Sequence, residues 1–255
     1  MIIRCEHKTM NLEAGLSVME CLRTLAVDTQ GVLAVQQGGR VLELTDVITR
    51  EGEIRPLTLR DEEGRRIYER SLRFVALLAF RRLMPGQRVR IEYSVGGGVF
   101  MHTPGRVLSE TDVKDVHAEM QRIVQADLPF DKREWSLDDA IAYFEADGQP
   151  DKVALLRRRT VPFFMMYECG GMWEYFYGAM APSTGYVRVF GAQHLPGRGM
   201  AILTPDPENP ACHAAYIDRP QFKTRSVIIP TSELTSIFFL HSGIPRHQPI
   251  QQGRI

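Results

Sequence analysis

The pattern of apolar and polar positions in residues 1–60 predicts a small unit of short strands around one helix. Short apolar runs bounded by turn residues predict the strands. Ser17 followed by Glu20 forms a capping box, which predicts a helix from there to about Ala26. The expected strands cover residues 2–5, 8–12, 31–35, 41–44 and 54–59. Several strands and one helix in so short a stretch indicate a β-grasp, a sheet curled over a helix.

From residue 61 onward the apolar positions recur with longer helical periods. Acidic residues 61–63 precede a helix expected over residues 65–84, which Pro85 and Gly86 end. Further helices are expected over residues 109–126, after Ser136, and over 151–159. Strands are expected over residues 89–93, 99–101, 163–167, 172–177, 186–190 and 200–203. We therefore predict an α+β protein in which helices pack on an antiparallel sheet.

Composition and charge narrow the class of protein. The chain has 255 residues, with 44% hydrophobic residues and 31 acidic residues balanced by 31 basic ones. This balance gives no strong global field toward nucleic acid or membrane, so an anion site would be a local patch. The four cysteines form no C-x-x-C pair, and the apolar run 74–80 is too short to span a bilayer. We expect a cytoplasmic protein without membrane association.

Six short motifs occur in one order along the chain. They are LTLRDEEG (57–64), LMPG (83–86), ADLPF (126–130), DDAI (138–141), GQPDK (148–152) and APSTG (181–185). In this order and spacing they resemble threonyl-tRNA synthetases, from the junction of the TGS and editing domains onward. The resemblance implies a β-grasp TGS domain over residues 1–62. It also implies an editing-like domain over residues 63–222, with the fold of the second additional domain of threonyl- and alanyl-tRNA synthetases.

The segment Tyr175-Phe176-Tyr177-Gly178 before residues 182–185 is similar to a second group, the bacterial uridine (nucleoside) kinases. In that group a TGS and editing-like region precedes a P-loop kinase domain. This chain has no G-x-x-x-x-G-K-[ST] motif, so we expect no phosphate transfer by the chain alone. Residues 223–255 do not resemble the kinase continuation. We interpret them as a divergent C-terminal tail that arose by truncation or frameshift, or as a lineage-specific ending.

The resemblance also indicates where editing chemistry would lie. The editing site of the synthetases uses an H-x-x-x-H helix motif and a C-x-x-x-H loop motif. Their positions fall here on Phe74 and Leu78 of the helix, and on Phe176 and Met180 of the loop. None of these four side chains can bind zinc or act as a general base. We therefore predict no catalytic residue, no metal and no cofactor, and a cleft that is either apolar filling or an apolar pocket.

Residues around that cleft are the candidate ligand contacts. The candidates are Phe74, Leu78, Glu174, Tyr175, Tyr177, Met180, Ser183 and Thr184. Glu174 stands where the synthetase family has an acidic residue, and its carboxylate can accept from a ligand amine or hydroxyl. Ser183 and Thr184 can offer hydroxyls and backbone N–H groups. The aromatic run 173–177 fits either a core or, on one face of a strand, a platform for a nucleoside base.

Clustered arginines give a candidate RNA or phosphate patch on the long helix. They are Arg66, Arg70, Arg73, Arg81 and Arg82. A patch of this kind would bind RNA with strong salt dependence. The alternative is an ordinary solvated helix face.

Three functions remain open at this point. The leading hypothesis is a non-catalytic ligand-binding or regulatory module related to the N-terminal half of a uridine kinase. The alternatives are a hydrolase acting on mischarged aminoacyl-tRNA and an RNA-binding module. Candidate partners are a nucleoside or nucleotide, an RNA, and a P-loop kinase domain supplied elsewhere.

Overall fold

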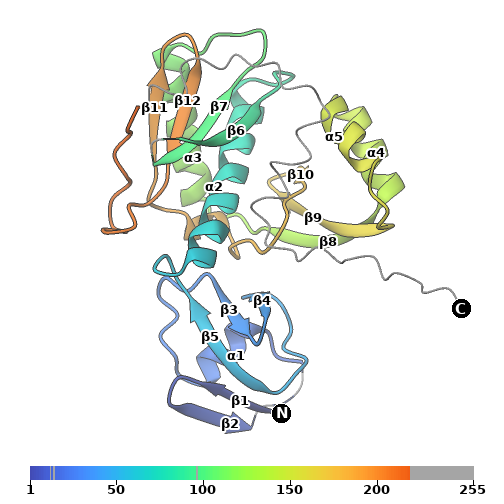
Figure 1. Cartoon of the computed structure of the whole chain (residues 1–255), viewed down its shortest axis with the longest axis vertical. Helices are drawn as coiled ribbons and strands as arrows, with labels where there is room; N and C mark the ends of the chain where they lie inside the picture. Colours follow the sequence, from blue (N-terminus) through green and yellow to red (C-terminus); the bar gives the residue numbers. More distant parts are fainter. Residues whose placement is uncertain (12, 14, 96, 219–255) are drawn as a thin grey trace, which may run out of the picture. The chain divides into compact units, whose positions relative to one another are not determined.

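The computed structural model of the chain describes residues 1–11, 13, 15–95 and 97–218 (Figure 1). Residues 219–255, which include the predicted tail 223–255, lie outside the described residues, as do Leu12 and Gly96. Residues 1–218 form one compact unit. The described part holds five α-helices and twelve β-strands in a mixed order, which confirms the α+β class.

The N-terminal part is a five-stranded sheet with one helix. The strands are β1 (Ile2–Cys5), β2 (Lys8–Asn11), β3 (Ala34–Gln37), β4 (Arg40–Glu43) and β5 (Gly52–Leu57). Their order is β2-β1-β5-β3-β4, and β1 and β5 are the parallel pair in it. Helix α1 (Val18–Thr24) begins at the predicted capping box of Ser17 and Glu20. Its buried side chains, such as Leu22, share a core with Ile3 and Ile54.

Helix α2 (Glu62–Leu83) follows this sheet directly and is the longest element of the described residues. The preceding segment folds back against its first turn, where the Thr58 N–H donates to the Asp61 carboxylate at 2.8 Å. A Cβ atom at Gly64 would lie 1.9 Å from the Thr58 carbonyl oxygen. The absence of a side chain at Gly64 therefore allows the linker to pack tightly against the helix.

A four-stranded antiparallel sheet packs with α2 and α3 (Glu110–Gln125). Its strands are β6 (Arg90–Val95), β7 (Gly98–His102), β11 (Gly191–Leu195) and β12 (Gly199–Leu203), in the order β11-β12-β7-β6. Figure 1 shows the two helices on one face of this sheet. Met101 and Ile202 contribute to the largest apolar core, together with Val116 of α3 and Leu72 of α2. A capping box of Ser109 and Asp112 starts α3, as the sequence predicts.

A third sheet lies between these elements in the sequence. Its strands are β8 (Asp131–Ser136), β9 (Phe163–Cys169) and β10 (Met172–Glu174), in the order β10-β9-β8. Helices α4 (Leu137–Ala146) and α5 (Pro150–Leu156) pack on it through a small core that contains Phe144, Leu156 and Met166.

Two sequence predictions about strands were wrong. Residues 186–190 form no strand; a short 3-10 helix, η1 (Thr184–Tyr186), precedes them, and the next strand is β11. The Tyr68 hydroxyl donates to the Val189 carbonyl at 2.9 Å and accepts from the Val189 N–H at 2.7 Å. The backbone of Val189 is therefore hydrogen-bonded to a side chain in place of a neighbouring strand. The predicted strand 172–177 ends at Glu174. Strand β8 was missed because its charged sequence lacks an apolar run.

The finer structural expectations remain predictions. These are the β-grasp TGS and synthetase second-additional-domain folds, and the domain bounds at residues 62 and 222. In the part of the chain that the structure describes, no helix combines the length and apolar character needed to cross a bilayer.

One buried carboxylate connects the N-terminal sheet to the later elements. Glu43, at the end of β4, is 5% exposed. Its Oε1 accepts from the Tyr167 hydroxyl at 2.5 Å and from the Met180 N–H at 2.9 Å. Its Oε2 lies 2.8 Å from the Lys132 ammonium, which also pairs with Asp46. Because a buried charge is costly without partners, these contacts fix strands β4, β8 and β9 and the backbone at Met180 relative to one another.

The pKa values at this cluster follow from burial and charge. Burial and the Glu43 carboxylate both raise the pKa of the Tyr167 hydroxyl, so it remains a hydrogen-bond donor. Burial alone would lower the pKa of Lys132, but the Glu43 and Asp46 carboxylates outweigh it and raise that pKa. Both groups are therefore held in the protonation states that their contacts with Glu43 require.

The Gly64→Ala variant is expected to destabilise the protein. Alanine in a solvated helix normally stabilises it by about 1 kcal/mol over glycine. Here the new methyl group would meet the Thr58 carbonyl, and we expect a loss of about 2 kcal/mol in the free energy of unfolding. Urea denaturation measures it. Gly39→Ala is the control, because a Cβ there meets no atom within 4 Å; equal losses in the two variants would contradict the packing at Gly64.

The Glu43→Gln variant tests the buried carboxylate. Glutamine keeps the shape but removes the charge that pairs with Lys132, so we expect a loss of about 2 kcal/mol in the free energy of unfolding. The matched control is Glu53→Gln on β5, where the side chain is exposed and we expect a change below about 0.5 kcal/mol. An unchanged urea midpoint for Glu43→Gln would refute a stabilising role for this carboxylate.

Candidate functional site

The backbone of the loop over residues 177–185 is bonded to the surrounding elements. The Met180 N–H donates to Glu43, and the Ala181 N–H donates to the Ser71 hydroxyl of α2 at 2.9 Å. The Ala179 carbonyl accepts from Arg70, and the Pro182 carbonyl accepts from the Phe130 N–H at 3.1 Å. These backbone groups are used internally, and they hold the loop in a single conformation.

The hydroxyl groups of the loop are also used internally. The Ser183 hydroxyl donates to the Asp127 carboxylate. The Thr184 hydroxyl donates to the Ile123 carbonyl at 2.8 Å and accepts from the Leu128 N–H at 2.9 Å. Ser183 and Thr184 thus tie the loop to the end of α3, and their role as ligand contacts stays a prediction.

The four positions aligned with the synthetase Cys/His residues lie in one apolar core. Phe74, Leu78 and Met180 are 0%, 2% and 1% exposed. Phe176 is partly buried and its ring centroid lies 5.6 Å from that of Phe74, which also stacks on Phe130 at 5.4 Å. Side chains in such contact fill the space between α2 and the loop, and they offer neither a nitrogen or thiolate ligand for zinc nor a proton acceptor.

No cluster of three or more His, Cys, Asp or Glu residues suited to a metal ion occurs among the residues that the structure describes.

The aromatic run 173–177 is divided between two cores and the solvent. Trp173 and Tyr175 pack into the core beneath α4 and α5, where the Tyr175 ring meets Phe164 at 5.0 Å. Arg159 lies over the Tyr175 ring at 5.1 Å and donates to its hydroxyl. Tyr177 is 55% exposed. Of the candidate aromatic residues, Tyr177 is therefore the one whose ring is largely open to a ligand.

Glu174 has an ionic partner that the sequence analysis did not identify. Its side chain is 5% exposed, and it forms an ion pair with Lys152 of α5. It also accepts from the Tyr175 N–H at 2.8 Å. The Lys152 ammonium lies 5.0 Å from the centre of the Phe144 ring. Lys152 is the last residue of the motif at residues 148–152, but the sequence alone does not show that the fold places it beside Glu174.

Each of the five arginines of the predicted RNA patch has a carboxylate partner. The pairs are Arg66 with Glu62 and Glu63, Arg70 with Glu63, Arg73 with Glu69, Arg81 with Asp147, and Arg82 with Glu119. These local counter-charges reduce the field that an RNA phosphate would feel. The RNA patch stays a prediction.

A cavity of about 610 Å³ lies at the C-terminal end of the loop. Its lining includes Asp127, Gly185, Arg188 and Phe190. The Gly185 N–H donates to Asp127 at 3.0 Å, and the Gly185 carbonyl accepts from the Arg188 Nε at 2.7 Å. Within the described residues Arg188 has no carboxylate partner at ion-pair distance. Sequence reasoning missed this arginine because it stands alone, outside the arginine clusters.

The structure thus does not gather the eight candidate ligand residues at one place. Phe74, Leu78 and Met180 lie in the main core, whereas Tyr175 packs beneath α4 and α5. Ser183 and Thr184 face the end of α3.

Comparison with known proteins gives one consistent result. The chain is 28% identical over 188 residues to the threonine–tRNA ligase of Carboxydothermus hydrogenoformans, which covers 72% of this chain and 29% of that protein. It is 26% identical over 221 residues to the ligase of Nitratidesulfovibrio vulgaris, covering 85% and 34%, and 25% identical over 181 residues to that of Symbiobacterium thermophilum, covering 69% and 28%.

No family model matches the chain. The chain spans about a third of the length of the curated relatives that it matches. These similarities do not by themselves show the TGS or uridine kinase parts of the resemblance, which stay predictions. They support a threonyl-tRNA synthetase-like region in this chain.

Proposed function

We propose that this chain is an editing-like module directed at threonine tRNA. The observation that carries the proposal is the match to threonine–tRNA ligases over 72% and 85% of the chain. In this proposal residues 1–62 form a TGS-type β-grasp domain and residues 63–222 form the editing-like domain. The proposal favours tRNA over the nucleoside and kinase partners expected from the sequence, which stay predictions.

The geometry of the loop supports binding of tRNA without hydrolysis at the aligned positions. Hydrolysis of an ester needs an activated water, and Phe74, Leu78 and Met180 provide only apolar surface. A water placed among them would lack the polar partners that an ordered water requires. The module would therefore recognise a charged tRNA and leave its ester intact.

A phosphate contact for the tRNA is available next to the loop. Arg188 is exposed, and its Nε is held by the Gly185 carbonyl, so the guanidinium has a fixed position at the cavity. The neighbouring Asp127 carboxylate already accepts from Ser183 and Gly185, which spreads its negative charge. A guanidinium without an ionic partner loses no ion pair when it binds a phosphate.

A second candidate function is hydrolysis of mischarged tRNA by replacement residues. It is favoured by the Lys152–Glu174 pair, a largely buried carboxylate and ammonium beside the aromatic run. Buried charge pairs of this kind occur in active sites as well as in structural networks. An enzyme of this kind would use Glu174 to orient or deprotonate water.

The Arg188→Gln variant is expected to bind threonine tRNA roughly tenfold more weakly, because one charge-assisted phosphate contact is lost. The slope of log affinity against log salt should fall by about one. Filter binding across a salt series measures both. The matched control is Arg66→Gln, whose guanidinium is already paired with Glu62 and Glu63, and it should keep the affinity of the parent protein. Equal losses in both variants would contradict a specific role for Arg188, and no binding by the parent protein at low salt would reject the tRNA proposal.

A deacylation assay separates the two candidate functions. We expect mischarged threonine tRNA to lose its amino acid at the same rate with the protein as in buffer, because the aligned positions carry no proton acceptor. Acceleration that is abolished in Glu174→Gln, but retained in the exposed control Glu53→Gln, would establish the second candidate in place of the first.

A further inference from the structure

The surface around Tyr186 connects helix α1 to the groove beside Arg188. Tyr186 lies in η1, is partly buried, and packs against the core beneath α1 as well as against the main core. Arg23 stands in the last turn of α1, and Arg188 follows Tyr186 by two residues; both arginines are exposed. Burial raises the pKa of the Tyr186 hydroxyl, and the positive charges of Arg23 and Arg188 act against this rise, so both guanidinium groups lie near the hydroxyl.

The polar groups of this surface are available to a ligand. Within the described residues neither Arg23 nor Arg188 has a carboxylate at ion-pair distance, and the Tyr186 hydroxyl has no hydrogen-bond partner. The opposing charge is Asp127, whose Oδ1 already accepts from the Ser183 hydroxyl and from a backbone N–H. Because its pKa is raised, the Tyr186 hydroxyl keeps its proton and can donate to an anion.

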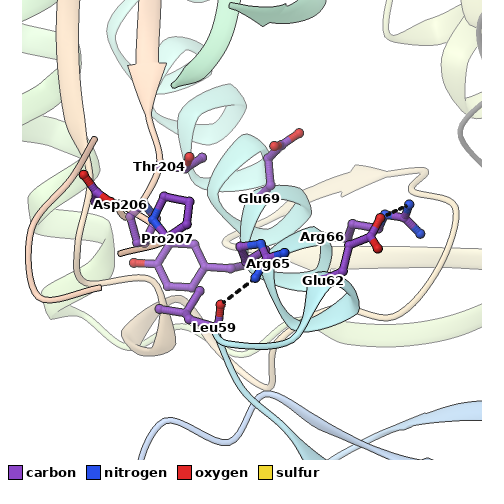
Figure 2. A pocket seen from close by; sticks show the side chains of 10 residues that line it. Leu59, Glu62, Arg65, Arg66, Glu69, Thr204, Asp206 and Pro207 are labelled. Atoms are coloured by element: carbon purple, nitrogen blue, oxygen red, sulfur yellow. Dashed lines mark hydrogen bonds and ion pairs between the residues drawn. The ribbon is translucent and has the colours of Figure 1, made fainter. Parts of the chain in front are cut away.

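The arginines of α2 differ from these two. Figure 2 shows Arg66 beside Glu62, with a nitrogen and an oxygen 2.6 Å apart, and Glu63 lies at 3.5 Å. Glu69, which Figure 2 also labels, pairs with Arg73. A phosphate at that helix would compete with carboxylates that already hold the guanidinium groups. Arg23 and Arg188 carry no such competition.

The groove of about 610 Å³ continues this surface along α3. Gln121 and Gln125 line it one helical turn apart; both are exposed, and neither side chain is hydrogen-bonded within the described residues. Four residues advance a helix by about 6 Å, which is close to two steps of a nucleic-acid strand at about 3.4 Å each. An amide and a ribose 2′-hydroxyl each donate and accept hydrogen bonds, so the two groups match.

The groove suits a polymer that lies across it more than a small molecule enclosed by it. All four of its polar side chains are exposed, namely those of Gln121, Gln125, Asp127 and Arg188. Its apolar lining consists of Val124 and Phe190, both of which are buried. Positive charge at one end and neutral amides along α3 are complementary to a backbone of phosphates and sugars.

We propose that one strand of an RNA lies along this surface. Its phosphates contact Arg23, Tyr186 and Arg188, and its ribose hydroxyls contact Gln121 and Gln125. This inference rests on the proposed tRNA function and adds the path of the strand and the groups that distinguish RNA from other nucleic acids. The two guanidinium groups and the phenol bind phosphates whatever the sugar, whereas the amide contacts need a 2′-hydroxyl.

A salt series tests the phosphate contacts in the full chain. Arg23→Gln and Arg188→Gln should each weaken binding of threonine tRNA roughly tenfold and lower the slope of log affinity against log salt by about one. The double variant should lower that slope by about two. Arg66→Gln, which is paired with Glu62, is the control and should change neither quantity. A slope that Arg23→Gln leaves unchanged would overturn the path across α1.

A modified RNA tests the ribose contacts. The ligands are an RNA hairpin with the acceptor-stem sequence of threonine tRNA and the same hairpin with 2′-fluoro groups, which keep an RNA-like shape but cannot donate. The parent protein should bind the unmodified hairpin about tenfold more tightly. The double variant Gln121→Ala with Gln125→Ala should lose most of this preference at an unchanged salt slope, because no charge is removed. Gln30→Ala, an exposed glutamine outside the groove, is the control and should keep the preference.

The outcomes separate this inference from the proposed function. Equal binding of the two hairpins by the parent protein would overturn the ribose contacts and leave the tRNA proposal standing. A preference that persists in the double glutamine variant would do the same, with circular dichroism checking that the variant is folded. Absence of any RNA binding by the parent protein at low salt would reject the tRNA proposal and this inference together.

Discussion

The arrangement around the loop of residues 177–185 depends on the burial of the Glu43 carboxylate. Its hydrogen-bond partners Tyr167 and Met180 stand 124 and 137 residues away in the sequence. A buried carboxylate is costly without its partners, so strands β4, β8 and β9 and the loop depend on one another for stability. Arg70 and Ser71 of α2 bind the same loop from another side. The loop is therefore a rigid junction between these elements.

The elements that could be predicted from sequence are those that local physics determines. Ser17 and Ser109 with their acidic partners three residues later start helices whatever the rest of the chain does. Strand β8 could not be predicted, because the segment Asp131–Ser136 is mostly polar. It forms a strand through its pairing with β9 and through the contact of Lys132 with Glu43. The strand predicted at residues 186–190 does not form. Its apolar sequence favours a strand, but the backbone N–H and carbonyl of Val189 bond to the hydroxyl of the distant Tyr68 instead.

For the candidate site, too, some properties could be predicted from the sequence and others depend on the fold. That Phe74, Leu78 and Met180 carry no ionisable group follows from the identity of these side chains and could be read from the sequence. The fold decides which charged side chains are left without an ionic partner, because ion pairs such as Arg81 with Asp147 join residues 66 positions apart. The clustered arginines therefore drew attention in the sequence but are paired in space. Arg188, which lies outside these clusters, has no carboxylate partner within the described residues and donates to the Gly185 carbonyl.

The apolar replacements in the core of the loop are physically interdependent. A histidine at position 74 alone would bury ring nitrogens against the rings of Phe130 and Phe176, and each nitrogen left without a hydrogen bond would cost about 1–3 kcal/mol. A cysteine or histidine in the loop would face the same surroundings. A metal could compensate only if several ligands were present together, so partial sets are less stable than either the full set or none. In this chain the aligned positions carry none of these ligands. Its apolar packing stabilises the loop directly.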